Sequence, residues 1–251
     1  MKLYKSIPMN LIIDVGNTRG KAAVFENDSL VELLVFNEET LIEKVDFFLS
    51  KYTIECGIIS SVRNMSVNNL DKLKKRLSFI ELNSETKVPF KNLYQTPKTL
   101  GVDRIALVAN ASVKFPKANV LIIDAGTCIT FDFVNSVNEY RGGAISLGLE
   151  MRYKALEKFT SKLPLLEKTE LEIVTGNTTE TSIHSGVVNG ILHEIKGVIT
   201  QYEKENSYLT VVLTGGDTYF LAKQLKSSIF ANPNFVLEGL NTILIHNKEE
   251  C

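Results

Sequence analysis

Two short segments of the chain carry the same arrangement of aspartate, glycine and threonine after an apolar run. Residues 11–18 read Leu-Ile-Ile-Asp-Val-Gly-Asn-Thr, and residues 121–127 read Leu-Ile-Ile-Asp-Ala-Gly-Thr. A glycine after a buried strand lets the backbone turn sharply, and the N–H groups of such a turn can cradle a phosphate. An aspartate at the strand end is a ligand type that Mg²⁺ accepts. The pair predicts a nucleotide phosphate site, although an ordinary hairpin turn explains either segment alone equally well.

A third glycine segment, Thr214-Gly215-Gly216-Asp217, follows an apolar strand and precedes a helical pattern. Its two glycines would admit an adenosine ring or ribose against bare backbone, and the alternative is a simple strand–helix turn. Other nucleotide signatures are excluded. The run from Gly16 to Lys21 is one residue too short for a P-loop and continues with Ala22 instead of Ser or Thr. No G-x-G-x-x-G follows a strand, so a dinucleotide fold is not supported.

The elements around these segments alternate between short apolar runs and helical spacing, which predicts an α/β fold. The first aspartate segment opens a group of strands near 11–15, 20–26 and 30–36. The second opens another near 120–124, 127–134 and 138–141, and the two aspartates are 110 residues apart. This repetition predicts a duplicated fold, with domains at 1–118 and 119–251. A glycine-rich turn at 142–148, a helix near 151–159 and a long helix near 183–202 are expected in the second domain.

Composition excludes several classes of protein. The 251 residues include 28 Lys and Arg against 29 Asp and Glu, so the basic excess of a nucleic-acid binder is absent. No apolar run approaches the length of a membrane span. Cys56, Cys128 and Cys251 are odd in number and lack the spacing of a metal site. Scattered thiols are typical of a reducing compartment, which predicts a cytoplasmic protein.

The order of these motifs resembles the acetate and sugar kinase/Hsp70/actin superfamily and, within it, the type III pantothenate kinases. The resemblance implies two duplicated ribonuclease-H-like domains of the actin-like ATPase type, with a nucleotide cleft between them. It also implies ATP-dependent phosphorylation of pantothenate to 4′-phosphopantothenate, the first step towards coenzyme A. The segments that carry it occur in family order: Asp14–Thr18, Gly101–Arg104, Asp124–Thr130, Gly142-Gly143 and Thr214–Asp217.

The same resemblance implies roles in binding and activating pantothenate. In Gly101-Val102-Asp103-Arg104 it makes Asp103 the acceptor of the hydroxyl proton, and a predicted helix N-terminus there would favour the ionised carboxylate. From residue type alone Asp103 is more simply a helix cap. Arg104 would pair with the substrate carboxylate or a phosphate. Tyr94 and Thr179 match further pantothenate contacts, with Thr178 or Thr181 in place of Thr179 if the register slips.

The ATP and cation sites implied by the resemblance involve all three glycine segments. Asp124 would bind a monovalent cation, K⁺ or NH₄⁺, although the residue type equally allows Mg²⁺ there. Asp14 would lie near the Mg²⁺ that accompanies ATP. The implied ATP contacts are Asp14, Val15, Gly16, Asn17, Thr18, Arg19, Gly20, Lys21, Thr127, Gly215 and Gly216.

Some features depart from the family pattern or stay unassigned. The glycine-rich turn lacks the usual Pro-Gly and ends in Leu147-Gly148, and Asp132 has no evident task. Residues 1–8 precede the usual family start, so Met1 or Met9 is the initiator. Family members are dimers, and the apolar seam of Ile183, Val187, Ile191 and Ile195 is either part of a dimer surface or an ordinary core helix.

Two other functions remain as alternatives. A kinase-like transcriptional activator would not need turnover, but it should have lost the proton acceptor or a phosphate loop, whereas Asp103, Asp14 and Asp124 are all present. Another small-molecule kinase or ATPase of the superfamily would keep the loops and would have no reason to carry Gly-x-Asp-Arg.

Overall fold

The computed structural model describes residues 9–63, 66–225 and 229–250 and divides the chain into two compact α/β units. Residues up to Pro116 and from Phe235 onward form the first unit, and residues Lys117–Asn234 form the second. The predicted boundary near residue 118 is close to this division, but the predicted second domain wrongly includes the C-terminal helix. Residues 1–8, which bear on the choice between Met1 and Met9, and Cys251 lie outside the described residues.

The first unit is built on a sheet with strand order β3-β2-β1-β4-β5. Strands β1, β2 and β3 pair antiparallel, whereas β4 pairs parallel with β1, and β5 parallel with β4. The elements of this unit are β1 (Met9–Val15), β2 (Gly20–Glu26), β3 (Ser29–Phe36), α1 (Leu41–Lys51), β4 (Ile54–Ser61), α2 (Val67–Lys74), β5 (Phe79–Glu81), β6 (Lys91–Asn92), α3 (Val102–Lys114) and α8 (Phe235–His246).

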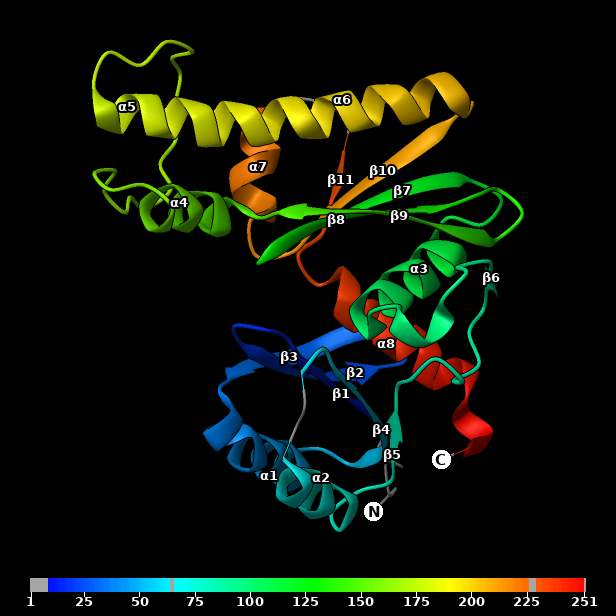
Figure 1. Cartoon of the computed structure of the whole chain (residues 1–251). Helices are drawn as coiled ribbons and strands as arrows, with labels where there is room; N and C mark the ends of the chain where they lie inside the picture. Colours follow the sequence, from blue (N-terminus) through cyan, green and yellow to red (C-terminus); the bar gives the residue numbers. More distant parts are fainter. Residues whose placement is uncertain (1–8, 64–65, 226–228, 251) are drawn as a thin grey trace. The chain divides into compact units, whose positions relative to one another are not determined.

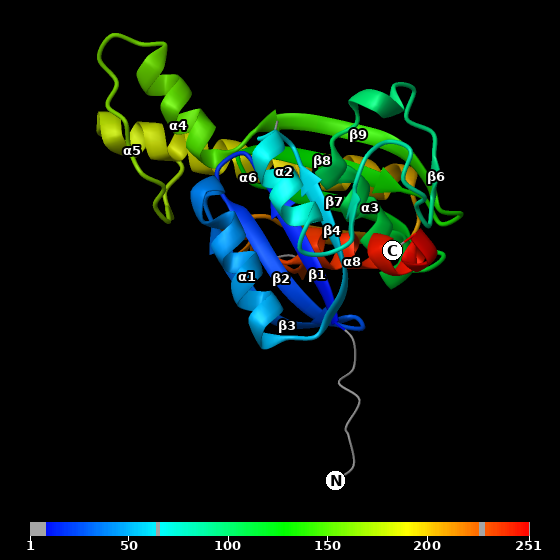
Figure 2. The ribbon, with the colours of Figure 1, turned by 90° about the horizontal axis from the view of Figure 1, so that it is seen from below.

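Helices cover both faces of this sheet. Helices α1 and α2 lie against one face, and α3 and α8 against the other (Figures 1 and 2). Helix α8 contacts α3 so closely that a Cβ on Gly239 would lie 1.9 Å from the Ala106 carbonyl oxygen. The Asn10 side chain donates to Asn241 Oδ1 at 2.8 Å. These close contacts are the reason why α8 belongs to the first unit.

The second unit repeats the plan of the first. Within it the strand order is β11-β10-β7-β8-β9, with β7, β8 and β9 antiparallel and β10 and β11 parallel to β7. The predicted duplication of an α/β unit is therefore confirmed. The elements are β7 (Asn119–Ala125), β8 (Cys128–Val134), β9 (Glu139–Leu147), α4 (Leu149–Lys158), α5 (Thr179–His184), a π-helix (Ser185–Asn189), α6 (Gly190–Glu205), β10 (Leu209–Thr214), α7 (Thr218–Leu225) and β11 (Phe230–Ala231).

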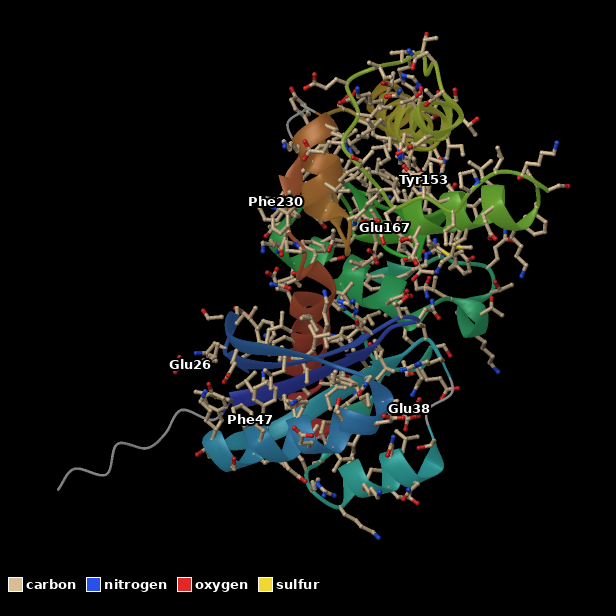
Figure 3. All side chains as sticks on the ribbon, turned by 90° about the vertical axis from the view of Figure 1, so that its left-hand side faces the viewer. Glu26, Glu38, Phe47, Tyr153, Glu167 and Phe230 are labelled. Atoms are coloured by element: carbon tan, nitrogen blue, oxygen red, sulfur yellow. The ribbon has the colours of Figure 1, made fainter. Side chains whose placement is uncertain are left out.

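The predicted long helix consists of α5, the π-helix and α6, which continue one another (Figure 1). Its apolar seam of Ile183, Val187, Ile191 and Ile195 is buried in the core of the second unit itself, so the seam is an ordinary core face. On α4, Tyr153 faces this helix (Figure 3), and its hydroxyl lies 2.8 Å from His184 Nδ1. No helix among the described residues combines the length and the apolar character that a membrane span needs.

The glycine-rich turn predicted at 142–148 is mostly strand. Gly142 and Gly143 lie inside β9, opposite Phe133 and Asp132 of β8. A Cβ on Gly143 would lie 1.6 Å from the Phe131 carbonyl oxygen, so this glycine permits close contact between two strands. The chain turns at Gly148, which is the N-cap residue of α4.

Candidate functional site

The first aspartate segment forms the end of β1 and the turn of the β1–β2 hairpin. Asp14 is half-buried and pairs in register with Lys21 on β2 and Ser60 on β4. The Ser60 hydroxyl donates to Asp14 Oδ1 at 2.7 Å. Val15 and Gly20 close the hairpin, while Gly16 is half-buried and Asn17, Thr18 and Arg19 are exposed in the turn. The turn therefore presents the polar residues that the sequence predicts as phosphate contacts.

The Asp14 carboxyl has a strongly shifted pKa. Its pKa is raised from 3.8 to about 6, mainly because burial disfavours the charged form, and the negative charge of Asp103 acts in the same direction. The Ser60 hydrogen bond and the positive charge of Lys21 act in the opposite direction and lower the pKa. Asp14 is thus ionised at neutral pH at an energetic cost that a nearby cation would offset.

The residues near Asp14 fit Mg²⁺ of the kind that accompanies a nucleotide. Mg²⁺ is usually held by one or two carboxylates together with phosphate oxygens and water, and not by a cage of protein ligands. In the described part of the chain, no group of three or more His, Cys, Asp or Glu side chains forms such a cage. The single Asp14 carboxylate, with its raised pKa, matches this type of site.

The segment Gly101–Arg104 forms the start of α3, as predicted. Asp103 lies in the first helical turn, and its Oδ1 accepts a hydrogen bond from the Arg104 backbone N–H at 2.8 Å. A Cβ on Gly101 would lie 2.4 Å from the same oxygen, so glycine leaves room for this carboxylate. Val102 is the first residue of the helix.

Arg104 is only 5% exposed, and its guanidinium lies 5.6 Å from the centre of the Tyr94 ring. At this distance the cation and the ring attract one another, which helps to orient both side chains. The structure thus brings together Tyr94, Asp103 and Arg104, which the sequence places up to ten residues apart.

The second aspartate segment forms the β7–β8 hairpin in the second unit. Asp124 is half-buried near the end of β7, and Gly126 N–H donates to the Cys128 carbonyl at 2.9 Å. The Thr127 carbonyl accepts from Gly148 N–H at 3.1 Å, which ties this loop to the start of α4, and the Thr127 side chain is exposed. Although the turn between β9 and α4 lacks the proline of the family pattern, this backbone hydrogen bond supports the β7–β8 loop.

The third segment contacts the second directly. Gly215 has φ +95°, and a Cβ there would lie 2.4 Å from both Asp124 Oδ1 and the Ala125 carbonyl oxygen. The Asp217 N–H also donates to the Ala125 carbonyl at 2.9 Å. Position 215 therefore requires glycine for two reasons: the backbone has a positive φ, and a side chain would collide with Asp124. The Asp124 carboxylate is a hard oxygen donor, which is the ligand type that fits a hard monovalent cation.

We expect Gly215→Ala to lower the free energy of unfolding by about 1–3 kcal/mol, because the new methyl group needs a left-handed backbone and meets Asp124. Gly216→Ala is the matched control, since a Cβ at Gly216 meets nothing within 4 Å and the residue has no positive φ. Urea denaturation of both variants measures the difference. Equal stability of the two variants would contradict the close contact at Gly215.

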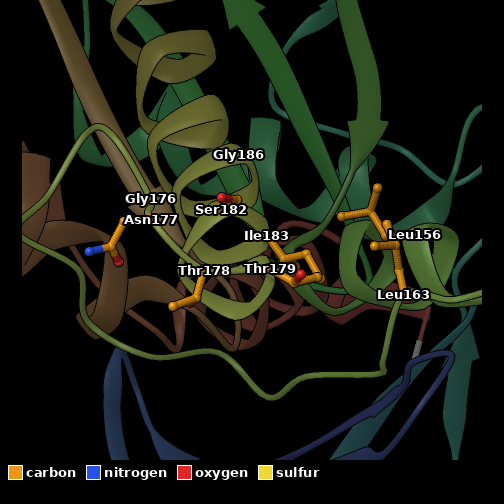
Figure 4. A pocket seen from close by; sticks show the side chains of 9 residues that line it. All are labelled: Leu156, Leu163, Gly176, Asn177, Thr178, Thr179, Ser182, Ile183 and Gly186. Atoms are coloured by element: carbon orange, nitrogen blue, oxygen red, sulfur yellow. The ribbon is translucent and has the colours of Figure 1, made fainter.

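A pocket of about 790 Å³ lies between α4 and the start of α5 in the second unit (Figure 4). Thr178 and Thr179 line this pocket, whereas Thr181 is not among its lining residues. Thr178 and Thr181 cap α5 through reciprocal hydrogen bonds of their hydroxyls and backbone N–H groups, and Thr179 stands outside that exchange. The apolar side chains of Leu156, Leu163 and Ile183 form another part of the wall, and the remaining lining residues are Gly176, Asn177, Ser182 and Gly186.

Some residues at the site were not found from the sequence. Ser60 is the last residue but one of the apolar strand β4, and only the strand register shows that it reaches Asp14. Asp132, which had no predicted task, is fully buried and accepts hydrogen bonds from Tyr140 Oη at 2.7 Å and Thr130 Oγ1 at 3.0 Å. The contacts of Ser60 with Asp14 and of Tyr140 with Asp132 cross between strands, so no spacing signal in the sequence points to them.

Residues 10–201 match the family model of type III pantothenate kinase. The chain belongs to the type III pantothenate kinase family. The family predicted from the motifs is thereby confirmed. A type III pantothenate kinase from Christiangramia forsetii is 49% identical over 243 residues, covering 96% of this chain and 100% of that relative.

Two solved structures have the same fold as this family member. A protein assigned to the Baf family of transcriptional activators, from Campylobacter jejuni, matches with a TM-score of 0.62 at 22% identity, over 95% of this chain and 99% of that chain. A glucokinase from an Antarctic psychrotroph matches with a TM-score of 0.53 at 11% identity, over 95% and 99% of the two chains. At these identities the likeness concerns the fold, and it agrees with the predicted sugar kinase and actin-like architecture.

Proposed function

We propose that this type III pantothenate kinase transfers a phosphoryl group from ATP to pantothenate with Asp103 as the proton acceptor. Phosphorylation of pantothenate in coenzyme A biosynthesis is the activity of the family. The role of Asp103 is supported by its position in the first turn of α3 and by its electrostatic effect on Asp14, since charges influence one another in this way when they are near. One of the two carboxylates can accept the hydroxyl proton while the other faces the metal and phosphate groups.

Pantothenate carries a carboxylate that needs a positive partner. The buried Arg104 guanidinium, oriented against the Tyr94 ring, supplies a planar fork suited to a carboxylate or phosphate. We propose these two residues, with Gly101, Val102 and Thr179, as pantothenate contacts. Thr179 is preferred to Thr178 and Thr181 because it lines the pocket and is not part of the α5 capping box.

ATP is proposed to contact the three glycine segments, with Asp14 as the residue nearest to Mg²⁺ and Asp124 as the ligand of K⁺ or NH₄⁺. The cations supply positive charge that offsets the charge on the phosphate oxygens. The chain's own part is to hold the carboxylates and backbone N–H groups in place. Gly215 serves this purpose because it keeps the backbone against Asp124.

A homodimer in the cytoplasm is the proposed state of the enzyme. Phe159 and Val174 lie in the segment between α4 and α5, and they are 81% and 74% exposed. A second copy would remove such apolar surface from water.

The experiment that tests this function is ADP release by the purified chain with Mg-ATP. We expect turnover to require pantothenate and either K⁺ or NH₄⁺, with little ADP formed when choline replaces the cation. Turnover without pantothenate would favour an ATPase. A folded protein that binds ATP and turns over neither with K⁺ nor with NH₄⁺ would favour the regulatory alternative.

A further inference from the structure

The duplicated sheets place two comparable rows of side chains at the ends of their central strands. The first row runs across β2, β1 and β4 and consists of Lys21, Asp14 and Ser60. The second row runs across β8, β7 and β10 and consists of Thr130, Asp124 and Thr214. In each row the aspartate is central, with one antiparallel and one parallel neighbour in register.

The three side chains of each row lie on one face of their sheet. Residues in register on neighbouring strands point to the same face, with Cβ atoms about 4.5–5.5 Å apart. The residues next to the row members confirm the alternation. Ile13, Ala22 and Ile59 belong to the core beneath α1 and α2, so the first row lies on the opposite face. Ile123, Ile129 and Leu213 belong likewise to the core of the second unit, opposite the second row.

In the first row the central acid has a hydroxyl group and an ammonium group as neighbours. The Ser60 hydroxyl donates to Asp14 at 2.7 Å, and the positive charge of Lys21 acts on the same carboxylate. A primary ammonium group therefore stands next to the central aspartate in the sheet of the first unit.

In the second row a threonine hydroxyl replaces the ammonium group. Thr130 occupies the register position of Lys21, and its hydroxyl donates to Asp132, which leaves its lone pairs as acceptors. Thr214 is fully buried, and its Oγ1 has no hydrogen-bond partner among the described residues. A buried hydroxyl without a partner is costly, and in register with Asp124 it is an oxygen atom suited to ligate a cation.

We propose that the monovalent cation assigned to Asp124 takes the place that the Lys21 ammonium has in the first row, with Thr130 and Thr214 as further oxygen ligands. This inference rests on the proposed role of Asp124 and extends it to two residues that the family motifs do not assign. It also explains why NH₄⁺ suits such a site, because NH₄⁺ has the same charged donor group as the lysine side chain.

Thr214→Val tests the ligand role. Valine has the shape of threonine without the hydroxyl, so in choline chloride the variant should be as stable as the parent chain or more stable. In the parent chain K⁺ should increase the affinity for Mg-ADP. In Thr214→Val we expect the K⁺ concentration needed for half of this increase to be about fivefold higher or more. Urea denaturation in choline chloride measures the stability, and isothermal titration calorimetry of Mg-ADP in KCl and choline chloride mixtures of equal ionic strength measures the K⁺ dependence without turnover.

Thr130→Lys tests whether a lysine ammonium group can replace the monovalent cation in the second row. Thr130→Met is the control, because its side chain is long and carries no charge. We expect Thr130→Lys to bind Mg-ADP with equal affinity in KCl and choline chloride. Thr130→Met should bind more weakly than the parent chain in KCl. If Thr130→Lys does not fold, Thr214→Val alone decides the proposal.

The outcomes separate this inference from the proposed function. An unmodified chain whose Mg-ADP affinity and turnover do not respond to K⁺ would overturn the cation role of Asp124 and this inference with it. A parent chain that responds to K⁺, together with Thr214→Val and Thr130→Lys variants that respond in the same way, would overturn the inference and leave the function intact.

Discussion

Asp103→Asn is expected to lower kcat by about 10²–10⁴-fold, the usual contribution of a general base, while Mg-ADP binds nearly as well as before. Asparagine keeps an oxygen that can accept the Arg104 backbone N–H, which now donates to Asp103 Oδ1 at 2.8 Å. The start of α3 should therefore stay folded, and only the capacity to receive the hydroxyl proton is lost. Steady-state ADP release and calorimetric titration of Mg-ADP measure the two effects separately.

The control for this substitution is Asp71→Asn, on the exposed side of α2. It makes the same chemical change away from Tyr94 and Arg104, and we expect unchanged kinetics. If Asp103→Asn retained kcat within a factor of about three, the assignment of Asp103 as proton acceptor would be wrong.

Asp14→Asn is expected to raise the free energy of unfolding by about 1–3 kcal/mol above pH 7 in the absence of Mg²⁺ and nucleotide. The pKa of Asp14 is about 6 in the folded chain against an ordinary value of 3.8. Well below pH 3.8 the carboxyl is protonated in both states and contributes no difference. As the pH rises through 6, the unfolded chain releases this proton more readily, so the parent chain loses stability that the neutral asparagine keeps.

The same variant should lose most of its turnover, because it lacks the negative charge proposed to face Mg²⁺. Urea denaturation of parent and variant at pH 4, 6 and 8 tests the stability effect. Ser60→Ala is a useful companion variant. It loses the hydrogen bond that lowers the Asp14 pKa, so it should be less stable than the parent chain at pH 8. A stability difference that does not change between pH 4 and pH 8 would show that Asp14 is not the titrating group.

Local patterns predicted much of the fold. The strand Gly20–Glu26 has the predicted bounds, and α3 starts at Val102 as expected, because alternation and helical spacing are set by neighbouring residues. The repeated Asp-x-Gly segments also predicted the duplication, because each segment consists of consecutive residues. The C-terminal helix was placed in the wrong unit because its partner α3 is more than 100 residues away in sequence, and no local signal records that contact.

The candidate site was predictable where its residues are consecutive and not where they meet across strands. Asp14, Asp124 and Gly215 follow directly from motifs. Gly142 and Gly143 were interpreted as a turn because glycine permits both turns and close strand contacts, and the 1.6 Å approach at Gly143 distinguishes the two only in three dimensions. Ser60 and Thr214 depend on strand register, which one sequence does not specify.

The return of α8 to the first unit has a consequence for biosynthesis. The ribosome completes residues 117–234 before it adds the helix that packs on α3. Until then, the side of α3 around Ala106 and Asn110 lacks the partner that covers it, including the Phe235 carbonyl that accepts from Asn110 at 3.0 Å. The second unit is continuous in sequence and has its own core, so it can mature first during translation, and the N-terminal unit is the later of the two to be completed.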